Sequence, residues 1–519
     1  ILCSNAYKNL SILLAGERNA HICFYLNRKK REIMLFGKER HHPRMLKPQR
    51  ISYSDLHYIL RLSRGDLSFR PMFIVASVEL GNTTTKAILT ATDLKSGKTY
   101  VLNKTVKMTR EAKAQEGVFC QTVHAVELSE HSIAELVCRT LEECARSVGI
   151  SVADIHFVVR STGVTACFST VKEVEGVIQA LAKGCMLAGV PPRKMISPMT
   201  IENIPAELRA FSRMDKTYFD GAVAGNIPPS GEPIVGNEME GELVTAGLKE
   251  AAKWVGVDFR NPVLSLDFGT TLAGRITDDE LPYAHVIGSF CGLAGAIPDA
   301  LVSKVVDENF PTMLDFQRKA GGAGARFGRR RVKDKVVKEY VEEIFDHLVV
   351  EKVKGRTRMG GVPVNIDAAR KNNVVLIGVD AGVNRSELPK IAEIGEEIAR
   401  SEGIHCLNAV ADELSACLVE RLVEIAMEEG LLMRNTKIGI TGRAGITGRK
   451  PFLTLEKLSA LFGRKMDDEV VFADDGLARG AAVLGRCMHQ FGTPENPIGG
   501  VQGGGCVMGK RLKLQRKEK

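Results

Sequence analysis

A short pattern of an apolar strand, a glycine-containing turn and a returning strand occurs twice in the chain, and it constrains the fold more than any other feature. Residues 73–80 form an apolar run that ends at Gly81-Asn82, and residues 83–92 return with partial alternation. A second copy spans residues 263–277. Each copy reads as two antiparallel strands joined by a tight turn, so the repeat predicts two equivalent lobes of an α/β fold that face a cleft.

The spacing of apolar residues predicts the elements between and after the two copies. Over residues 129–148 they recur at helical spacing, with Ser132 and Glu135 as a capping box and Gly149 as a stop. The other predicted elements are strands over residues 99–108, 156–161 and 437–441 and helices over residues 412–429 and 475–489. Strands and helices therefore alternate along most of the chain, as in an α/β fold.

These elements divide the 519 residues into four parts. We expect a basic N-terminal extension, residues 1–71, that is not part of the folded unit. The first lobe is predicted over residues 72–255 and the second over residues 256–491, with a less regular insertion over roughly 310–400. Residues 492–519 are a tail rich in Gly and Lys, which we expect to be disordered.

The charge of the chain is concentrated in the extension. Residues 1–70 hold 14 Lys and Arg against 5 Asp and Glu, and taking these from the totals of 71 and 62 leaves 57 basic and 57 acidic residues for the rest. Because the body is balanced, nucleic acid is not an expected partner. For the extension itself, a basic arm for nucleic acid or an anionic membrane and an Arg-rich transit segment stay open as alternatives.

Neither a membrane span nor a metal cluster is expected from the composition. No uninterrupted apolar stretch reaches 18 residues. The 12 Cys include no Cys-x-x-Cys pair, and the nearest two, Cys138 and Cys144, are separated by five residues. Zinc and iron–sulfur sites need closer spacing, so we expect reduced, mostly buried thiols in a cytoplasm.

The first turn, Glu79 to Lys86, carries the groups that a phosphate-binding loop needs. Gly81 lets the backbone bend tightly, and the N–H groups after it can donate to phosphate oxygens together with the hydroxyls of Thr83 and Thr84. Glu79 ends the strand with a carboxylate that can hold hydrated Mg²⁺, because this ion keeps several of its waters.

The second turn, Asp267-Phe268-Gly269-Thr270-Thr271, offers the same groups from the opposite lobe. Two such turns could clamp a triphosphate, with Glu79 and Asp267 about one Mg²⁺ and a positioned water attacking in line. A single glycine–threonine hairpin is usually only a hairpin. The pair, at corresponding places of two units, predicts a shared phosphate site.

The order of five segments resembles the actin, Hsp70 and sugar-kinase superfamily of two-lobed ATPases. The two turns look like its phosphate motifs, and Gly439-Ile440-Thr441-Gly442-Arg443-Ala444-Gly445 is similar to its adenosine-binding strand and loop. Residues 237–255 and 474–484 look like its two interlobe helices. The resemblance implies two duplicated RNase H-like (actin-like ATPase) lobes around an interlobe nucleotide cleft.

This resemblance nominates the site residues. Glu79 and Asp267 are the expected catalytic carboxylates and hold Mg²⁺ through water. The expected nucleotide-binding residues are Gly81, Asn82, Thr83, Thr84, Lys86, Gly269, Thr270, Thr271, Thr441, Gly442, Arg443, Gly445 and Asp474. Small residues such as Gly247 and Gly480 would let the two interlobe helices approach closely, as a hinge requires.

From residue 72 onward the chain resembles the methanogenesis marker protein 14 family of methanogenic archaea, which is related to ATPases that reductively activate corrinoid proteins. The resemblance implies a cytoplasmic protein that uses ATP and Mg²⁺. Its ATPase cycle would couple lobe closure to the activation or maturation of a methanogenesis enzyme, such as methyl-coenzyme M reductase or a corrinoid protein. The client protein and the oligomeric state, a homodimer included, stay open.

Two departures from the superfamily pattern bear on hydrolysis. Glu79 stands where Asp is usual, which moves the carboxylate by about one methylene, and the second turn lacks the doubled glycine of Hsp70-like members. Related activators often carry an iron–sulfur cluster, but this chain has neither of their cysteine arrangements, so no intrinsic cluster is expected. A small-molecule kinase on the same fold and a non-catalytic nucleotide-sensing scaffold are the alternative functions.

Other polar residues receive no role from the sequence. Residues 380–386 read as an ordinary strand–turn–helix connection, and Arg160 could reach the cleft without an assigned task. His124, His285 and His405 have no partner at metal-ligand spacing and are interpreted as structural.

Overall fold

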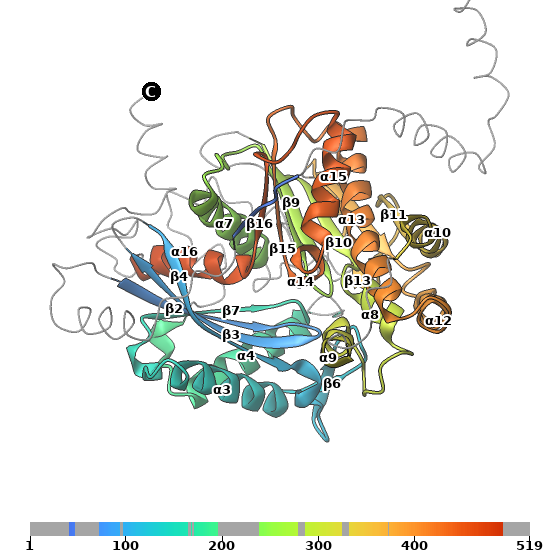
Figure 1. Cartoon of the computed structure of the whole chain (residues 1–519). Helices are drawn as coiled ribbons and strands as arrows, with labels where there is room; N and C mark the ends of the chain where they lie inside the picture. The colour runs from blue at the N-terminus through green and yellow to red at the C-terminus, as the bar shows by residue number, and fades with distance from the viewer. Residues whose placement is uncertain are drawn as a thin grey trace, which may run out of the picture.

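The computed structural model describes residues 41–46, 72–93, 97–164, 168, 171–195, 238–278, 286–323, 332–371 and 373–490. These residues form a mixed α/β structure with two main sheets flanked by helices (Figure 1). The α/β class expected from the sequence is confirmed. Among the described helices, none has both the length and the apolar character needed to cross a membrane.

The first sheet contains the first copy of the sequence pattern, in the strand order β4–β3–β2–β7. Strand β3 is antiparallel to β2 and β4, and β7 is parallel to β2. These strands are β2 (Met72–Leu80), β3 (Thr84–Asp93), β4 (Thr99–Met108) and β7 (Phe157–Thr162). One face carries α3 (Glu130–Arg146) and α4 (Val171–Leu187), and the other carries α16 (Gly476–Gln490) (Figure 1).

The second sheet has the order β1–β16–β15–β8–β9–β10–β14–β11. Its strands are β1 (Arg44–Leu46), β8 (Val263–Phe268), β9 (Leu272–Thr277), β10 (Val286–Gly292), β11 (Val349–Lys352), β14 (Val375–Asp380), β15 (Lys437–Thr441) and β16 (Val470–Ala473). Helix α7 (Glu238–Val255) packs on one face, and α13 (Ile404–Glu428) lies on the other with α15 (Lys450–Phe462) against it (Figure 1).

Shorter elements connect these layers. The helices among them are α8 (Ala296–Val302), α9 (Met313–Ala323), α10 (Asp334–Phe345), α11 (Ile366–Lys371), α12 (Leu388–Ser401) and α14 (Arg443–Ile446), with 3₁₀ turns at Thr109–Ala112, Val152–Asp154 and Pro192–Lys194. Strands β5 (Val118–Gln121) and β6 (Glu127–Ser129) form one small hairpin, and β12 (Arg358–Met359) and β13 (Val362–Pro363) form another.

The two copies of the sequence pattern occupy equivalent places in the two sheets. In the second sheet, β8 is antiparallel to β9, β9 is antiparallel to β10, and β15 is parallel to β8. The order β10–β9–β8–β15 therefore repeats the order β4–β3–β2–β7 with the same strand directions. As a consequence, the first turn after β2 and the second turn after β8 lie at the same edge of corresponding hairpins.

The helices that the sequence suggested as close neighbours cross with direct backbone contact. A Cβ placed on Gly247 of α7 would lie 1.8 Å from Gly476 O, and one on Gly480 of α16 would lie 1.8 Å from Leu243 O. At this crossing Arg479 is fully buried, and its Nη1 donates to Glu250 Oε2 at 2.7 Å. The predicted close approach of the two helices is confirmed.

The sheets do not follow the domain boundary expected near residue 255. Helix α7 precedes the second sheet in sequence and packs on it, whereas α16, at the end of the described chain, returns to cover the first sheet. Helix α7 therefore covers the second sheet although it lies within the first predicted lobe. Helix α16 covers the first sheet although it lies within the second predicted lobe. This exchange brings the two inner helices against each other (Figure 1).

Part of the N-terminal extension belongs to the fold, which corrects the expectation for residues 41–46. Strand β1 pairs in parallel with β16, with Leu46 opposite Ala473, and Leu46 is only 3% exposed. His42 N donates to Asp467 Oδ1 at 2.7 Å. An edge strand leaves unpaired N–H and C=O groups, and a short basic segment with one apolar residue is enough to cover that edge. The rest of residues 1–71 lies outside the described part of the chain.

The burial of Leu46 gives a direct test of this correction. We expect Leu46→Ala to lower the free energy of unfolding by about 2 kcal/mol, because it removes a buried side chain and leaves a cavity beneath α7. Arg44→Ala, two residues earlier on the same strand, should change it by less than about 0.5 kcal/mol, because its ion pair with Asp468 is exposed. Urea unfolding monitored by circular dichroism measures both; equal, small effects would mean that β1 does not contribute.

The segment over roughly 310–400 is more regular than the sequence suggested. It contains α9, α10, α11 and α12, and β14 lies inside the second sheet, parallel to β10 and antiparallel to β11. The expectation of a less regular insertion is wrong for most of this range, because the apolar run at Val375–Asp380 forms a strand that a large sheet buries. Residues 324–331 and the tail after residue 490 lie outside the described residues.

Two predicted helix starts also move. The N-cap of α3 is Ser129, whose Oγ accepts a hydrogen bond from Ser132 N, while Ser132 Oγ accepts one from Ser129 N. Helix α13 begins at Ile404, eight residues before the predicted start at Asp412, and ends before Gly430 as predicted.

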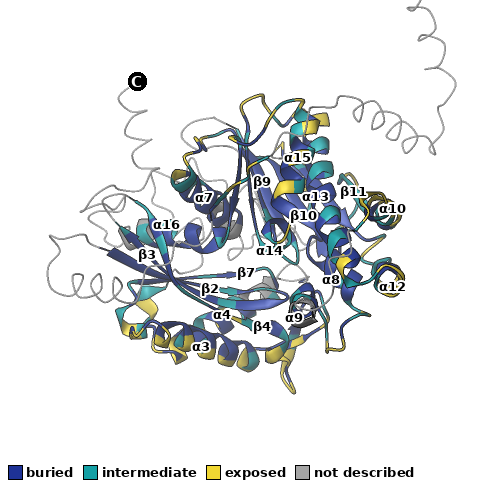
Figure 2. Ribbon diagram, viewed as in Figure 1, coloured by how far each residue is buried: buried dark blue, intermediate teal, exposed yellow. Residues whose placement is uncertain are grey.

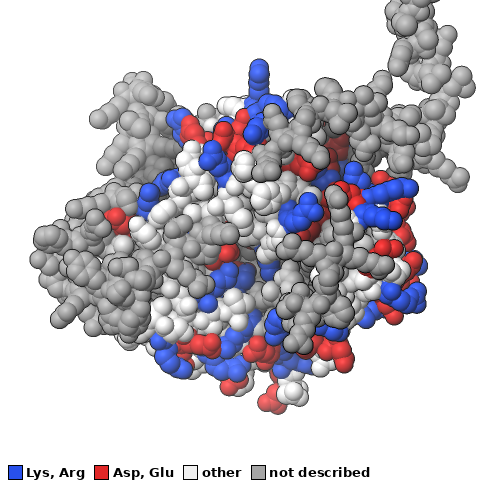
Figure 3. Space-filling view, viewed as in Figure 1, with Lys and Arg blue, Asp and Glu red and all other residues white. Residues whose placement is uncertain are grey.

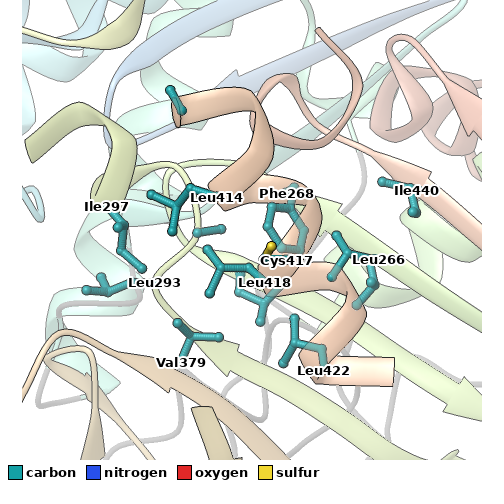
Figure 4. Close-up of a cluster of buried hydrophobic side chains, with 14 of the residues drawn as sticks. Leu266, Phe268, Leu293, Ile297, Val379, Leu414, Cys417, Leu418, Leu422 and Ile440 are labelled. Atoms are coloured by element: carbon teal, nitrogen blue, oxygen red, sulfur yellow. The ribbon is translucent and has the colours of Figure 1, made fainter. Parts of the chain in front are cut away.

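The alternation of side chains along β2 and β8 determines on which face of each sheet Glu79 and Asp267 lie. In β8, Leu264 enters the core beneath α13. Leu266 and Phe268 enter the same core, as Figure 4 shows, whereas Val263 packs with α7. Because side chains alternate, Asp267 belongs to the α7 face. In β2 the even-numbered residues enter the core beneath α3, so Glu79 lies on the α16 face. Both carboxylates therefore lie on the inner faces of the two sheets, whose central strands are largely buried (Figure 2).

Candidate functional site

The two turns meet where the two sheets face each other. Thr83 Oγ1, from the first turn, and Thr270 Oγ1, from the second turn, share a hydrogen bond of 2.7 Å, although 187 residues separate them. We call this contact the seam. Figure 3 shows a hollow between the two halves of the molecule, with Lys and Arg side chains visible in it. The structure thus brings together the two motifs that the sequence placed on opposite sides of a cleft.

Backbone hydrogen bonds hold the first turn in a tight shape. Gly81 N donates to Thr84 O at 3.0 Å, and a Cβ on Gly81 would lie 2.8 Å from that same oxygen. Thr109, at the end of β4, donates its N to Thr83 O at 2.9 Å and its Oγ1 to Gly81 O at 2.7 Å. Only a glycine fits at position 81, and Thr109 fixes the turn from outside.

The side chain of Asn82 is held by two backbone groups. Its Nδ2 donates to Gly163 O at 2.8 Å, and its Oδ1 accepts from Val123 N at 2.8 Å. Both ends of this buried amide are therefore used by the backbone. Asn82 connects the end of β7 to the loop over residues 122–126, and through this loop it positions His124.

The second turn rests on the segment before α8. Gly269 O accepts from Gly295 N at 2.8 Å, and Thr270 O accepts from Ala296 N at 3.0 Å. Thr271 forms a bridge with Leu293. The hydroxyl of Thr270 is left to face the first turn, while the carbonyl groups of the turn are fixed by the protein.

The loop that follows β15 passes directly over Asp267. Gly442 has a φ of +84°, and a Cβ there would lie 2.3 Å from Asp267 Oδ1. This contact explains the glycine without reference to a ligand. Gly445 packs equally tightly, since a Cβ there would lie 2.8 Å from Ile440 Cγ2.

Thr441 and Asp474 are tied to the ends of strands. Thr441 Oγ1 donates to Ala473 O at 2.8 Å and accepts from Gly476 N at 3.1 Å, so this buried hydroxyl holds the start of α16. Asp474 Oδ1 lies 3.5 Å from Lys104 Nζ. Lys104 also pairs with the buried Asp475, whose pKa is raised mainly by burial.

Acidic and basic groups alternate beneath the turns. Lys86 Nζ donates to both Glu79 oxygens at 3.0 Å. Burial acts to lower the pKa of Lys86, but Glu79 and then Asp267 and Asp475 outweigh it, so that pKa lies above its usual value. The cluster therefore keeps a charged lysine between carboxylates from both sheets.

Asp267 is the most perturbed carboxylate of this cluster. Burial, together with the charge of Glu79, raises its pKa to about 7, and Lys86 opposes this shift. Lys86 lies between the two carboxylates in charge as well, because Glu79 and Asp267 both raise its pKa. A carboxyl group with a pKa raised in this way is a candidate for function, because a bound cation would favour its charged form.

The residues at this site are better suited to hold a hydrated Mg²⁺ with one carboxylate, that of Asp267, than with two. Both oxygens of Glu79 already accept from Lys86, whereas Asp267 has no such cation bonded to it in the residues that the structure describes. Among those residues no three His, Cys, Asp or Glu side chains are grouped as metal ligands. Mg²⁺ keeps several waters and often uses one or two carboxylates, so this donor set suffices.

Arg443 lies at the same end of the site. Its Nη1 is buried and has no hydrogen-bond partner within the described part of the chain. Burial lowers its pKa, and the charges of Asp299 and Asp315 oppose that effect. A buried guanidinium with a free N–H group is suited to receive an anion.

Sequence reasoning missed a second layer around the seam. His124 Nε2 lies 3.1 Å from Thr83 Oγ1 and 3.6 Å from Asp299 Oδ2, and Thr83 Oγ1 donates weakly to the same Asp299 oxygen at 3.5 Å. Asp299 is 2% exposed and accepts from Met313 N at 2.7 Å. No local motif marks these residues, because the loop over 122–126 and α8 meet only in the folded chain.

Two arginines join the halves outside the seam. Arg110, after β4, forms a bidentate pair with Asp315 of α9 at 2.8 and 2.9 Å and holds the pKa of that carboxyl well below its usual range, with Arg318 assisting and burial opposing. Arg385 Nη1 donates to Val123 O at 2.8 Å. Arg385 and the residue before it both have positive φ, and Asp380 fixes this turn by accepting from their N–H groups.

Comparisons with known proteins give a family but no activity. A family model described as "uncharacterized protein conserved in archaea (DUF2114)" matches residues 72–515. An uncharacterized protein of Methanocaldococcus jannaschii is 50% identical over 458 residues, which is 87% of this chain and 93% of the relative. An uncharacterized protein of Methanothermobacter thermautotrophicus is 50% identical over 462 residues, 87% of this chain and 85% of the relative. Both organisms are methanogens.

Proposed function

This chain belongs to the archaeal DUF2114 family, with relatives in methanogens, and on that premise we propose that it binds and hydrolyses ATP at the seam. The proposal includes an actin-like arrangement of the two lobes and a role of the ATPase cycle in activating or maturing a methanogenesis enzyme. The family supplies the methanogen context, and the residues of the two turns support the nucleotide.

The observation that carries the proposal is the meeting of two glycine-bent threonine turns next to the carboxylate of Asp267, which opens the second turn. The hydroxyls of Thr83 and Thr270 are 2.7 Å apart, and Asp267, three residues before Thr270, has its pKa raised to about 7 by burial and Glu79. A hairpin that serves only the fold does not require a second hairpin with the same groups facing it. A phosphate chain has oxygens on both sides and could be bound by both turns together.

The residues divide the work as follows. Thr83 and Thr270 would donate their hydroxyls to phosphate oxygens in place of the bond they share, and Arg443 would donate its free N–H group to the anion. Bound Mg²⁺, held by Asp267 through water, would offset charge on the terminal phosphate. Lys86 and Glu79 keep the floor of the site charged and fixed. Closure of the two halves follows from binding, because one ligand contacts both turns.

Titration of the full chain with ATP and MgCl₂ in a calorimeter tests the proposal. We expect binding, slow release of phosphate, and an affinity about tenfold weaker in Thr270→Val, because a hydrogen bond to a charged oxygen contributes about 1.5–3 kcal/mol. Thr92→Val removes a buried hydroxyl bonded to Thr99, away from the seam, and should bind ATP as the wild type does. A wild-type protein that binds neither ATP nor GTP would contradict the proposal.

One observation favours a second function, a nucleotide sensor that does not hydrolyse. Because Lys86 occupies both oxygens of Glu79, that carboxylate is not free to assist a metal ion or a water. A sensor would bind ATP and change its partner without releasing phosphate. Phosphate release measured beside binding separates the two functions, and capture of proteins from methanogen extract with ATP or ADP present would identify the client.

A further inference from the structure

The side chains behind the seam form a site of their own. His124 comes from the loop over residues 122–126 and Asp299 from α8, and both contact the hydroxyl of Thr83. They belong to no motif that the sequence associates with the nucleotide. The side chain of His124 is 17% exposed and that of Asp299 is 3% exposed, so the pair lies beneath the surface but next to the proposed phosphate ligands.

We propose that His124 is the proton acceptor for the water that attacks the terminal phosphate, and that Asp299, which lies beside the same nitrogen, stabilises the imidazolium that forms. This inference rests on the proposed ATPase function and extends it to a residue with a defined step. Nε2 would take a proton from the water as its oxygen forms a bond to the terminal phosphorus. The bond from that phosphorus to the bridging oxygen breaks, and its electron pair leaves with ADP.

Geometry supports this task at the nitrogen itself. His124 Nε2 lies 3.1 Å from Thr83 Oγ1, the hydroxyl that we assign to the phosphate. The imidazole is therefore in hydrogen-bonding contact with a residue that would itself bind the reacting phosphate. Asp299 Oδ2, 3.6 Å from the same nitrogen, can stabilise the imidazolium that forms. Asp299 is itself fixed, because its other oxygen accepts from Met313 N at 2.7 Å.

The charges around His124 keep it able to accept a proton. The charged groups that face it are Asp299 of α8, Arg385 of the turn after β14 and Arg443 of α14. Burial lowers the pKa of His124, and the charges of the two arginines lower it further. The charge of Asp299 acts in the opposite direction and raises it. The imidazole is therefore mainly neutral at pH 7, as a proton acceptor must be.

Hydrogen bonds to the loop over residues 122–126 explain why His124 lies where it does. Asn82 fixes the loop over residues 122–126 through Val123 N, and Arg385 fixes it from the other half through Val123 O. The first turn and the second half thus both bond to the backbone of Val123, one at its N–H group and the other at its carbonyl oxygen. His124, the next residue, can be positioned correctly only when the two halves are closed, which would couple proton transfer to closure.

The test compares His124→Gln with His131→Gln in the full chain, at saturating ATP and Mg²⁺. His131 lies on α3 with its side chain 80% exposed and serves as the matched control. We expect His124→Gln to lower kcat about 100-fold with little change in ATP affinity, because loss of a general base affects the transition state more than binding. His131→Gln should leave both quantities unchanged, and thermal unfolding verifies that all variants fold.

A second variant separates a proton acceptor from a residue that only packs. The wild-type rate should fall at low pH with an apparent pKa below the ordinary histidine value, and His124→Gln should lose this acid limb. Asp299→Asn removes the charge that favours the imidazolium, so its acid limb should move to lower pH. Hydrolysis by His124→Gln at the wild-type rate and with the wild-type pH profile overturns the assignment of His124 alone, whereas absence of ATP binding in the wild type overturns the proposed function first.

Discussion

Asp267→Asn is expected to lower the rate of ATP hydrolysis about 1,000-fold while the protein stays folded. The substitution keeps the shape of the side chain but removes the negative charge that would hold a hydrated cation at the phosphate. Removal of one preorganised electrostatic partner from a buried site costs about 100- to 1,000-fold, and a group that organises the cation belongs at the upper end. Initial rates of phosphate release at saturating ATP and Mg²⁺ measure the effect.

The same carboxylate predicts a pH dependence of cation binding. Because burial and the charge of Glu79 raise the pKa of Asp267 to about 7, a proton must leave before a cation is bound at lower pH. The affinity for Mg²⁺ in the presence of nucleotide should therefore rise with pH up to about 7 and level off above it. In Asp267→Asn the affinity should be weak and nearly independent of pH.

Stability should change in the opposite sense. The folded protein binds this proton more tightly than the unfolded chain, whose carboxyl has a pKa near 3.8. The stability contributed by the protonated form is present below about pH 4 and is lost as the pH rises through 7. Asp267→Asn should consequently stabilise the protein more at pH 8 than at pH 5, as measured by thermal unfolding.

A matched exposed carboxylate controls for general effects of charge. Asp258→Asn alters an exposed Asp in the same half of the molecule, whose partner Arg260 is also exposed. It should change neither phosphate release nor the pH dependence of unfolding. Hydrolysis by Asp267→Asn within threefold of the wild-type rate would remove Asp267 from the mechanism.

Gly247→Ala is expected to destabilise the protein by about 3 kcal/mol or more. The added Cβ would lie 1.8 Å from Gly476 O, a backbone atom that cannot rotate away, so α7 and α16 would have to separate. Separation would also disturb the buried pair of Glu250 and Arg479, which has little water to replace it. Gly480→Ala should have a similar effect, since its Cβ would lie 1.8 Å from Leu243 O.

The control for this prediction is a glycine without neighbours. Gly355 has no heavy atom within 4 Å of the position that a Cβ would occupy, and its φ is not in the left-handed region. Gly355→Ala should therefore leave the urea midpoint within experimental error of the wild type. An equal, small effect of Gly247→Ala and Gly355→Ala would mean that the helices do not cross as closely as the structure has them.

Local patterns predicted the hairpins and the helix crossing because the physical cause lies in adjacent residues. A tight turn needs Gly81, an apolar run needs a sheet to bury it, and small residues on a helix allow another backbone to approach. The same reasoning did not foresee the backbone hydrogen bonds made by Asn82 and Thr441. Their side chains bond to backbone groups that come from distant segments, and nothing in the neighbouring sequence distinguishes such a residue from a ligand-binding one.

The sequence by itself determined the α/β class, the two glycine–threonine turns and the carboxylate that ends each preceding strand, since all of these depend on neighbours along the chain. Only the tertiary structure decided that the hydroxyls of Thr83 and Thr270 share a hydrogen bond and that Lys86 bonds to the carboxylate of Glu79. It alone also placed His124 and Asp299 next to each other at the seam. It also decided that residues 44–46 complete the second sheet. Such contacts join segments separated by tens to hundreds of residues, and their partners are selected by sheet order and packing rather than by local preference.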